Sequence, residues 1–294
     1  MKMCGTGKGS LIKMCGWGLL AWALTLNLLT FFPTLSTHAQ TLTSRPPMTE
    51  WFYADGIVNP EGLDPKSSRP GIWYKTGNYI ILFNLSPTET TVTATFYFED
   101  LAPRQHKEKV PARASGYIQV HDLSKVIPPA KLYGVRIQSE VPVIVQTTRG
   151  EFEPYNPVVT AMASLMAYPG PIGRKETKWA YSDGLTISSE APMEQMEWIT
   201  VLNPNAGQDV QVKVTFNFVG DQKSHLLVVP AERVSTVDLF HLPIFPKNKL
   251  AGVIIESNVP VIVQQVRRSY PKNVPTVTSM FTTMAYPIGD QKDE

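Results

Sequence analysis

The chain has 294 residues and a formal net charge of +2, with 27 basic and 25 acidic side chains. Three of the basic residues and both cysteines fall within the first 39 residues. The remaining chain has 24 basic against 25 acidic residues and no cysteine. This balance does not suggest a basic nucleic-acid-binding surface. Without a disulfide, the domains must be held by packing, even in an oxidising compartment.

Residues 1–39 have the pattern of a secretory signal peptide. Three lysines precede an apolar run from Met14 to Phe32, and Thr37-His38-Ala39 offers small residues at both recognition positions of a signal peptidase, before Gln40. We therefore expect an exported protein, periplasmic or extracellular. The alternative is an uncleaved membrane anchor, since 19 residues nearly span a bilayer. Interior glycines in the run favour cleavage.

Residues 40–50 form a polar leader, and the first domain begins at Trp51-Phe-Tyr-Ala-Asp-Gly56. Its counterpart is Trp179-Ala-Tyr-Ser-Asp-Gly184. Alternating aromatic and small residues followed by Asp-Gly predict a strand that ends in a turn. A long loop, residues 57–77, follows in the first copy and carries Trp73, which offers a stacking surface.

The next segments predict paired antiparallel strands. Residues 92–98 and 210–218 alternate apolar and polar side chains, which is typical of a strand with one face on a core and one face in water. Short return strands containing proline follow each of them.

The strongest repeat is Ser139–Arg149, which returns as Ser257–Arg267. At an offset of 118, residues 134–169 and 252–287 agree at 19 of 36 positions. Both copies contain Val-Pro-Val-Ile-Val, which leaves no polar face, so these strands should be covered on both sides. Met- and Thr-rich runs after them predict a last strand in each copy.

About eight short strands per copy, with turn signals every 8–12 residues and no convincing helical periodicity, predict an all-β protein of two tandem antiparallel β-sandwich domains. Domain 1 spans residues 51–169 and domain 2 spans residues 179–287. Residues 170–178 form a linker and residues 288–294 a tail. The linker is short, which favours domains that sit side by side.

The order of these motifs resembles the soluble sensory rhodopsin transducer family of bacteria. The first copy matches through Trp51, Ala54-Asp55-Gly56, Asn84, Val110-Pro-Ala-Arg113, Asp122-Leu123 and Ser139 to Arg149. The second copy keeps the pattern with changes, namely Ser182 for Ala54, Glu232 inserted before Arg233, and His241 where Asp122 aligns.

This resemblance covers nearly all of Trp51 to Pro287. It implies one β-sandwich per repeat, a shape similar to carbohydrate-binding sandwiches, and a tendency to form oligomers, here a homo-oligomer. Members of the family are single-domain cytosolic proteins that relay a signal from a membrane photoreceptor. This chain differs in being duplicated and in carrying an export signal.

Nothing in the sequence points to catalysis. After residue 39 there are four histidines and no cysteine, and no nucleophile elbow, zinc-binding pair or phosphate loop is present. His121-Asp122 is the only adjacent acid–base pair, and Phe240-His241 aligns with it. We therefore expect neither an enzyme nor a metal or other cofactor.

The best candidates for binding are a glutamine and an arginine that both repeats keep. An amide followed three residues later by a guanidinium suits a sugar hydroxyl, a carboxylate or an acidic side chain of a partner. The alternative is a structural role, with each arginine paired to the aspartate of its own repeat. The candidate ligand-binding residues are Gln146, Arg149, Gln264, Arg267, Asp55, Asp183 and Trp73.

We therefore expect an exported, non-catalytic binding protein whose partner is a glycan, another small polar ligand, or an envelope protein, and not a nucleic acid. One alternative is a structural or assembly module of the cell envelope. Another is a signalling adaptor, as in the family that the chain resembles.

Overall fold

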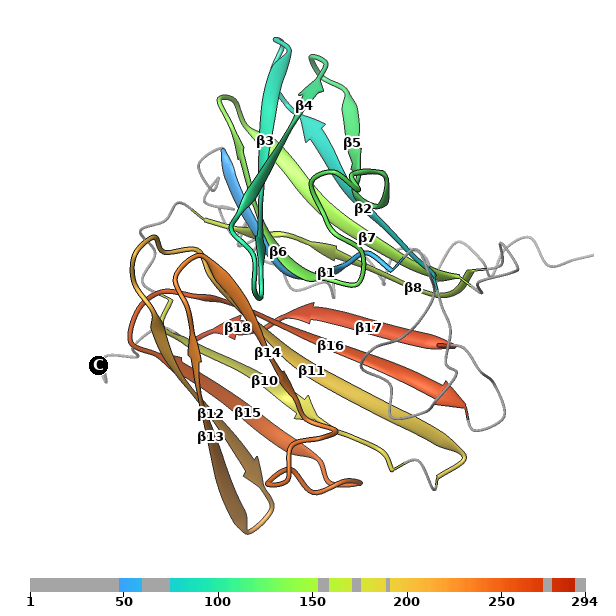
Figure 1. The fold of residues 1–294 in the computed structure, drawn as a ribbon, viewed down its shortest axis with the longest axis vertical. Coiled ribbons are helices and arrows are strands. Elements are labelled where there is room, and N and C mark those ends of the chain that lie inside the picture. The colour runs from blue at the N-terminus through green and yellow to red at the C-terminus, as the bar shows by residue number, and fades with distance from the viewer. Residues whose placement is uncertain are drawn as a thin grey trace, which may run out of the picture. The chain divides into compact units, whose positions relative to one another are not determined.

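The computed structural model describes most of the chain beyond residue 47, and it consists of two antiparallel β-sandwiches in tandem (Figure 1). This confirms the all-β class predicted from the sequence. Both sandwiches belong to one compact unit, Pro46–Glu294. Within the described residues, no helix is long and apolar enough to cross a membrane. The structure describes residues 48–59, 75–152, 159–170, 176–188, 191–271 and 277–288.

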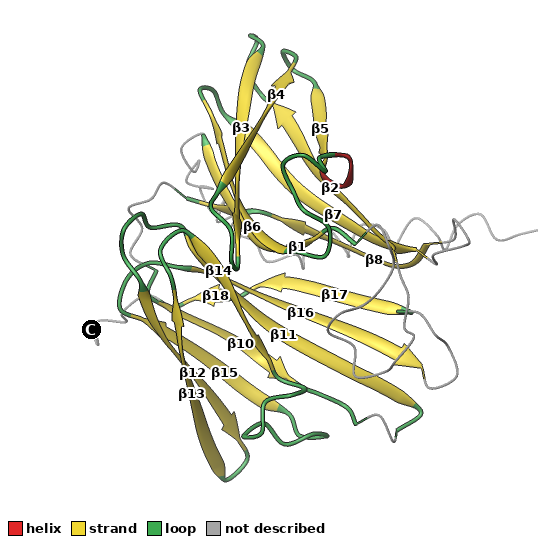
Figure 2. Cartoon of the chain, viewed as in Figure 1, coloured by secondary structure: helices red, strands yellow, loops and turns green. Residues whose placement is uncertain are grey.

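Domain 1 consists of a five-stranded sheet in the order β4-β3-β6-β1-β9 and a four-stranded sheet in the order β5-β2-β7-β8. A short 3₁₀ turn, η1 (Val120–Asp122), is the helical element among the described residues of this domain (Figure 2). The strands are β1 (Glu50–Ile57), β2 (Lys75–Asn84), β3 (Thr90–Phe98), β4 (Arg104–Val110), β5 (Ser115–Gln119), β6 (Leu132–Ser139), β7 (Val143–Phe152), β8 (Val159–Met166) and β9 (Tyr168–Pro169).

Domain 2 repeats this design, with a five-stranded sheet β13-β12-β15-β10-β18 and a four-stranded sheet β14-β11-β16-β17. Each of its strands is thus the counterpart of the strand nine places earlier in domain 1. The strands are β10 (Lys178–Gly184), β11 (Met193–Asn203), β12 (Val210–Phe218), β13 (Asp221–Val229), β14 (Arg233–Asp238), β15 (Ala251–Ser257), β16 (Ile262–Pro271), β17 (Ser279–Met284) and β18 (Tyr286–Pro287).

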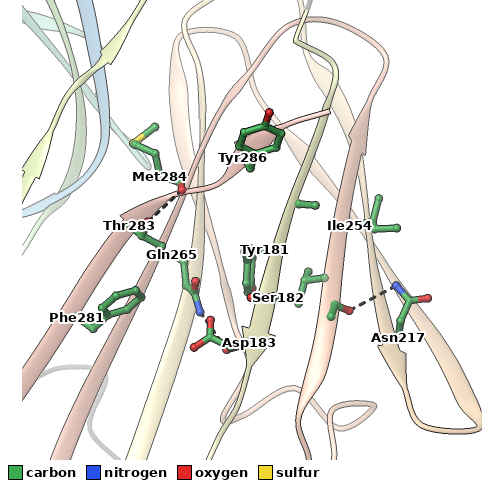
Figure 3. A pocket seen from close by; sticks show the side chains of 13 residues that line it. Tyr181, Ser182, Asp183, Asn217, Ile254, Gln265, Phe281, Thr283, Met284 and Tyr286 are labelled. Atoms are coloured by element: carbon green, nitrogen blue, oxygen red, sulfur yellow. Dashed lines mark hydrogen bonds between the residues drawn. The ribbon is translucent and has the colours of Figure 1, made fainter. Parts of the chain in front are cut away.

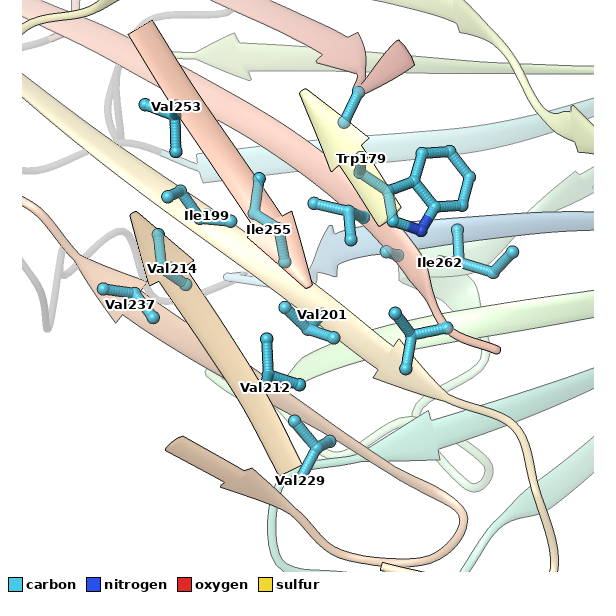
Figure 4. Close-up of a cluster of buried hydrophobic side chains, with 14 of the residues drawn as sticks. Trp179, Ile199, Val201, Val212, Val214, Val229, Val237, Val253, Ile255 and Ile262 are labelled. Atoms are coloured by element: carbon cyan, nitrogen blue, oxygen red, sulfur yellow. The ribbon is translucent and has the colours of Figure 1, made fainter. Parts of the chain in front are cut away.

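Each sandwich has its own apolar core between its two sheets. In domain 1, Trp51 is buried in this core and its indole Nε1 donates to the carbonyl of Val143 at 2.9 Å, which ties β1 to the opposite sheet. In domain 2, Trp179 is the counterpart and is fully buried with valines and isoleucines of both sheets (Figure 4). Alternating residues of strands such as β3 and β12 therefore point into these cores.

The two copies of the Val-Pro-Val-Ile-Val strand differ in burial. In β7, Val143 and Val145 are buried, but Ile144 between them is 37% exposed. In the second copy, Val261, which directly precedes β16, and the first two residues of β16, Ile262 and Val263, are all buried. The prediction of a strand covered on both sides is therefore confirmed for β16 and wrong for β7. The difference arises because domain 1 covers the outer side of β16.

The Trp-Asp-Gly motif at the start of each domain forms a β-bulge, whereas the sequence predicts a turn. The pairing of β1 with β6 shifts register between Tyr53 and Gly56, and the pairing of β10 with β15 shifts between Tyr181 and Gly184. Strand β1 then continues to Ile57. A bulge leaves residues outside the ladder, so their amides need other acceptors.

A buried asparagine closes the end of the second strand in each domain. The side-chain Nδ2 of Asn203 donates to the carbonyls of Gln208, Val229 and Pro230 at 2.8, 3.1 and 3.0 Å. In domain 1, Asn84 donates to the corresponding carbonyls of Thr88, Val110 and Pro111. One side chain thus supplies the hydrogen-bond donor for backbone carbonyl groups of two different segments.

Replacing this asparagine should destabilise the domain. We expect Asn203→Ala to lower the free energy of unfolding by about 2 to 3 kcal/mol, because buried carbonyls lose their donor. Urea denaturation followed by fluorescence measures the loss, with the exposed Gln211→Ala as the control. A loss below about 0.5 kcal/mol would show that water replaces the amide without cost.

Candidate functional site

The outer face of β1 in domain 1 packs against the outer face of β11 in domain 2. Along β1, Trp51 and Tyr53 point into the core of domain 1, whereas the alternate residues Phe52 and Ala54 join the apolar cluster of domain 2. Tyr97 of β3 joins the same cluster. The outer face of the five-stranded sheet of domain 1 therefore packs on the outer face of the four-stranded sheet of domain 2. We call this contact the tandem interface.

Gln264 connects the tandem interface to the bulge of β1. Its Oε1 accepts hydrogen bonds from the amides of Ala54 and Asp55 at 3.0 and 3.1 Å. Its Nε2 donates to Thr282 Oγ1 at 2.7 Å, which fixes the orientation of the side chain. Gln264 is fully buried. One amide oxygen of domain 2 thus satisfies both amides that the bulge removes from the ladder of domain 1.

Charged side chains extend this contact. Arg149 is buried and donates to Asp55 at 2.9 Å and to Glu151 at 3.0 Å. From domain 2, Arg268 donates to Glu151 at 3.1 Å, and the hydroxyl of Thr200 donates to Asp55 at 3.1 Å. Asp55, Arg149 and Gln264, three of the candidate binding residues, are therefore engaged in contacts within and between the domains.

Arg267 occupies the corresponding place in domain 2, but its surroundings are more open. It pairs with Asp183 at 3.1 Å and with Glu197 at 2.7 Å. The Asp183 side chain is 46% exposed, whereas that of Glu197 is fully buried. Gln265 also donates to Glu197 at 3.0 Å. The arginine thus links a buried carboxyl to one that faces solvent.

Burial sets the protonation behaviour of Glu197. Loss of solvation raises the pKa of its carboxyl from 4.5 to about 7, and the opposing pull of Arg267 and of the hydrogen bonds from Leu185 and Gln265 does not cancel it. The carboxyl therefore takes up a proton near neutral pH, at a point next to the exposed Asp183.

A pocket of about 620 Å³ lies beside this pair and extends around β10 of domain 2 (Figure 3). It is lined on one side by β10, β12 and β15 of the five-stranded sheet and on the other by β16 and β17 of the four-stranded sheet, with Tyr286 and Phe281 at its edges. Both aromatic side chains are exposed, at 76% and 45%. The lining residues are Ala180, Tyr181, Ser182, Asp183, Asn217, Gly252, Val253, Ile254, Gln265, Phe281, Thr283, Met284 and Tyr286.

The outer-face residues Ala180, Ser182, Asn217 and Gly252 form what we call the pocket face. The pocket face is the counterpart of the face by which domain 1 docks on domain 2. Ala180 and Ser182 follow Trp179 as Phe52 and Ala54 follow Trp51. In the same way, Asn217 pairs with Gly252 across the sheet, as Tyr97 pairs with Gly134. The face that is buried in domain 1 is thus left open in domain 2 by the residues that the structure describes. Ala180 and Asn217, which line the pocket, are smaller than their counterparts Phe52 and Tyr97.

The structure does not gather the candidate residues into one site. Gln146 lies partly exposed on the outer face of β7, where it donates to Ser164. Asp183 lines the pocket, and Arg267 lies behind it. Trp73 lies outside the described residues.

Several residues of these networks are not among the sequence candidates. They are Glu151, Glu197, Gln265 and Arg268. Glu197 could be recognised as a carboxylate inside the otherwise apolar Met196-Glu-Trp-Ile199. Glu151 and Arg268 give no such signal, because their counterparts, Ser269 and Gly150, are uncharged.

The described residues contain no group of three or more histidine, cysteine, aspartate or glutamate side chains that could hold a metal ion. None of the residues that line the pocket is a histidine or a cysteine.

Comparison with known proteins gives a family match for both repeats. The family model of the Anabaena sensory rhodopsin transducer matches residues 48–169 and again residues 172–287. No curated protein matches the chain.

Among solved structures, Thermotoga maritima 1070 is 22% identical, with 42% of this chain and 96% of that chain covered and a TM-score of 0.34. The Anabaena sensory rhodopsin transducer is 27% identical, with 34% and 86% covered and a TM-score of 0.28. Bacteroides uniformis β-glucuronidase 2 is 7% identical, with 82% and 32% covered and a TM-score of 0.16. That last likeness carries no argument about activity.

The raised pKa of Glu197 predicts a pH-dependent stability. Below about pH 4.5 the carboxyl is protonated in both the folded and the unfolded state. Between about pH 4.5 and 7 the folded state keeps a proton that the unfolded state loses. The stability of the wild type relative to Glu197→Gln should therefore fall across this window, by up to about 3 kcal/mol. Urea titrations at several pH values measure the difference, and a flat or rising difference would contradict the assignment.

The two repeat arginines should differ in their contribution to stability. We expect Arg149→Ala to cost about 3 to 5 kcal/mol, because it leaves Asp55 and Glu151 charged and buried. Arg267→Ala should cost less, since Asp183 reaches solvent and Glu197 can take up a proton. Thermal and urea unfolding measure both, with the exposed Lys109→Ala as the control. Equal, small losses would contradict the assigned burial of the Arg149 cluster.

Proposed function

The chain belongs to the Anabaena sensory rhodopsin transducer family, and from this premise we propose that it is a non-catalytic binding protein that recognises a protein partner. The pocket face of domain 2 is the recognition surface. We place this partner in the cell envelope, since residues 1–39 have the pattern that predicts an export signal.

One observation carries the proposal. The counterpart of the pocket face in domain 1 already binds a folded protein domain, through Phe52, Ala54 and Tyr97. A sheet face with the same backbone, the same bulge and the same glycine is left uncovered in domain 2. Duplicated domains keep their backbone geometry, so a face that accepts a β-sandwich in one copy suits a protein surface in the other.

The composition of the pocket face supports a protein partner over a glycan. Its polar side chains, Ser182, Asp183 and Asn217, stand among apolar ones such as Ile254 and Met284. A mixed surface with exposed aromatic residues at its edge is typical of protein interfaces. The competing hypothesis is a glycan whose sugar ring stacks on Tyr286. Crosslinking and a ligand screen distinguish a glycan from a protein partner.

We propose no catalytic role, because the acidic groups beside the pocket are held in ion pairs. Asp183 and Glu197 share Arg267. Two of the described histidines lie beside carboxylates elsewhere in the fold, His106 beside Glu108 and His241 beside Asp238. No nucleophile–base pair lines the pocket.

A photo-crosslinking amino acid in place of Ser182 tests the proposal in the organism's own cells. We expect covalent adducts with protein at this position and none at the exposed Ser124 of domain 1, which serves as the control. In parallel, a thermal-shift screen of the purified chain against glycans, polyols and organic acids tests the small-ligand reading.

Protein adducts without a thermal shift support the proposal. A glycan that stabilises the chain and abolishes the Ser182 adducts would contradict it. N-terminal sequencing of the protein from the envelope fraction tests export, and a start at Gln40 is expected.

A further inference from the structure

We propose that the partner inserts an arginine side chain into the pocket, where its guanidinium donates hydrogen bonds to the carboxylate of Asp183 and to Oε1 of Gln265 and stacks on Phe281. This inference rests on the proposed function, because it identifies the chemical group by which a protein partner is recognised. It concerns the side of the pocket that β16 and β17 line, together with the end of β10.

A buried acceptor without a donor marks the site. Gln265 lines the pocket beside Asp183 but is itself fully buried (Figure 3). Its Nε2 donates to Glu197 Oε1 at 3.0 Å and to the backbone carbonyl of Asp183 at 3.3 Å. A backbone carbonyl can only accept, so these contacts fix which end of the amide carries the nitrogen.

The oxygen of this amide is the atom that a ligand would satisfy. Among the described residues, no donor reaches Gln265 Oε1. A buried acceptor without a hydrogen bond is unfavourable and rare in folded proteins, so such an atom needs an explanation. A ligand that brings a donor into the pocket would supply the missing hydrogen bond.

The charges around the pocket favour a cation. Of the described residues that line the pocket, only Asp183 is charged at neutral pH, and its side chain is 46% exposed. Asp183 pairs with Arg267 at 3.1 Å, and the buried Glu197 pairs with the same guanidinium at 2.7 Å. When Glu197 is ionised, two carboxylates share one cation, and one negative charge is left in excess. A cationic ligand would neutralise it, whereas an anion would meet both this charge and the unpaired oxygen.

A guanidinium fits these groups better than an ammonium. It is planar and has five donors, so it can reach a carboxylate and an amide oxygen at the same time. It also stacks on aromatic rings, and Phe281 stands at the edge of the pocket with 45% of its surface exposed. An ammonium is compact and strongly hydrated, and therefore gains less from such a site.

Domain 1 has no equivalent of the unpaired amide oxygen. The counterparts of Gln265 and Thr283 are Thr147 and Leu165. The hydroxyl of Thr147 donates to the carbonyl of Leu165 at 3.3 Å, and the Leu165 side chain packs against the core of domain 1. A satisfied hydroxyl and an apolar side chain thus stand where domain 2 has an unpaired acceptor and the small, polar Thr283. The arginine site therefore belongs to domain 2.

Calorimetric titration of the purified chain with blocked tripeptides tests the inference. The probes are glycyl-arginyl-glycine and the same peptide with lysine or with citrulline, which keeps the shape of arginine without its charge. We expect the arginine peptide to bind at least about tenfold more tightly than the citrulline peptide, because hydrogen bonds from a charged donor to a carboxylate are the stronger ones. The lysine peptide should bind more weakly than the arginine peptide.

Three variants locate the site. Asp183→Asn removes the charge but keeps an oxygen for Arg267, and it should weaken binding of the arginine peptide at least about tenfold. Thr283→Leu introduces the residue of domain 1 without touching a charged group, and it should weaken binding to a similar extent by filling the pocket. Phe281→Ala should weaken binding about threefold or more through lost stacking. Glu140→Gln, at an exposed carboxylate of domain 1, is the matched control and should bind as the wild type does. Thermal unfolding of each variant verifies that it is folded.

Three results would overturn the inference. The first is no binding of the arginine peptide up to millimolar concentration. The second is equal binding of the citrulline or the lysine peptide. The third is binding that survives Asp183→Asn and Thr283→Leu in folded chains.

Crosslinking from position 182 separates this inference from the proposed function. Loss of the protein adducts when Asp183→Asn is added would support both. Adducts that persist undiminished with Asp183→Asn would keep the proposed function and overturn the arginine contact. Binding of the arginine peptide by a chain that gives no protein adducts would keep the guanidinium site and contradict the protein partner.

Discussion

Two backbone amides in the β1 bulge depend on one side chain from the other domain. The bulge takes Ala54 and Asp55 out of the ladder, and Gln264 Oε1 accepts from both. A buried amide without an acceptor costs about 1 to 3 kcal/mol, so the two domains are coupled through this oxygen. Phe52 and the Arg149 cluster surround it and exclude water. The bulge, the repeat glutamine and the domain packing are therefore parts of one arrangement.

The same arrangement explains why two near-identical repeats carry different surfaces. Domain 1 uses its five-stranded sheet and domain 2 its four-stranded sheet, so each repeat has one outer face buried and the other free. Residues in the buried positions form a connected network that includes Thr200, Gln264 and Arg268. In the free positions, the pocket face has small side chains, and the outer face of the four-stranded sheet of domain 1 has apolar ones such as Ile81 and Ile144.

Local pattern was sufficient to predict the strands and the duplication. The alternation in residues 210–218 gave β12 with its bounds, and the repeat gave two domains of one fold. The branched residues of β16 also predicted its burial on both sides. The same residues in β7 gave a wrong prediction, because only β16 has another domain on its outer side. The role of Gln264 could not be predicted from the sequence, since the two amides that donate to it lie 209 and 210 residues away. Nothing in the local sequence distinguishes it from the partly exposed Gln146.

The most direct measurement is amide hydrogen exchange, resolved by residue. We expect the amides of Ala54 and Asp55 to exchange slowly, because Gln264 accepts from both inside the tandem interface. The amides of Ser182 and Asp183, at the corresponding place in the β10 bulge, should exchange faster. Exchange at Ala54 and Asp55 as fast as at Ser182 and Asp183 would contradict the tandem interface.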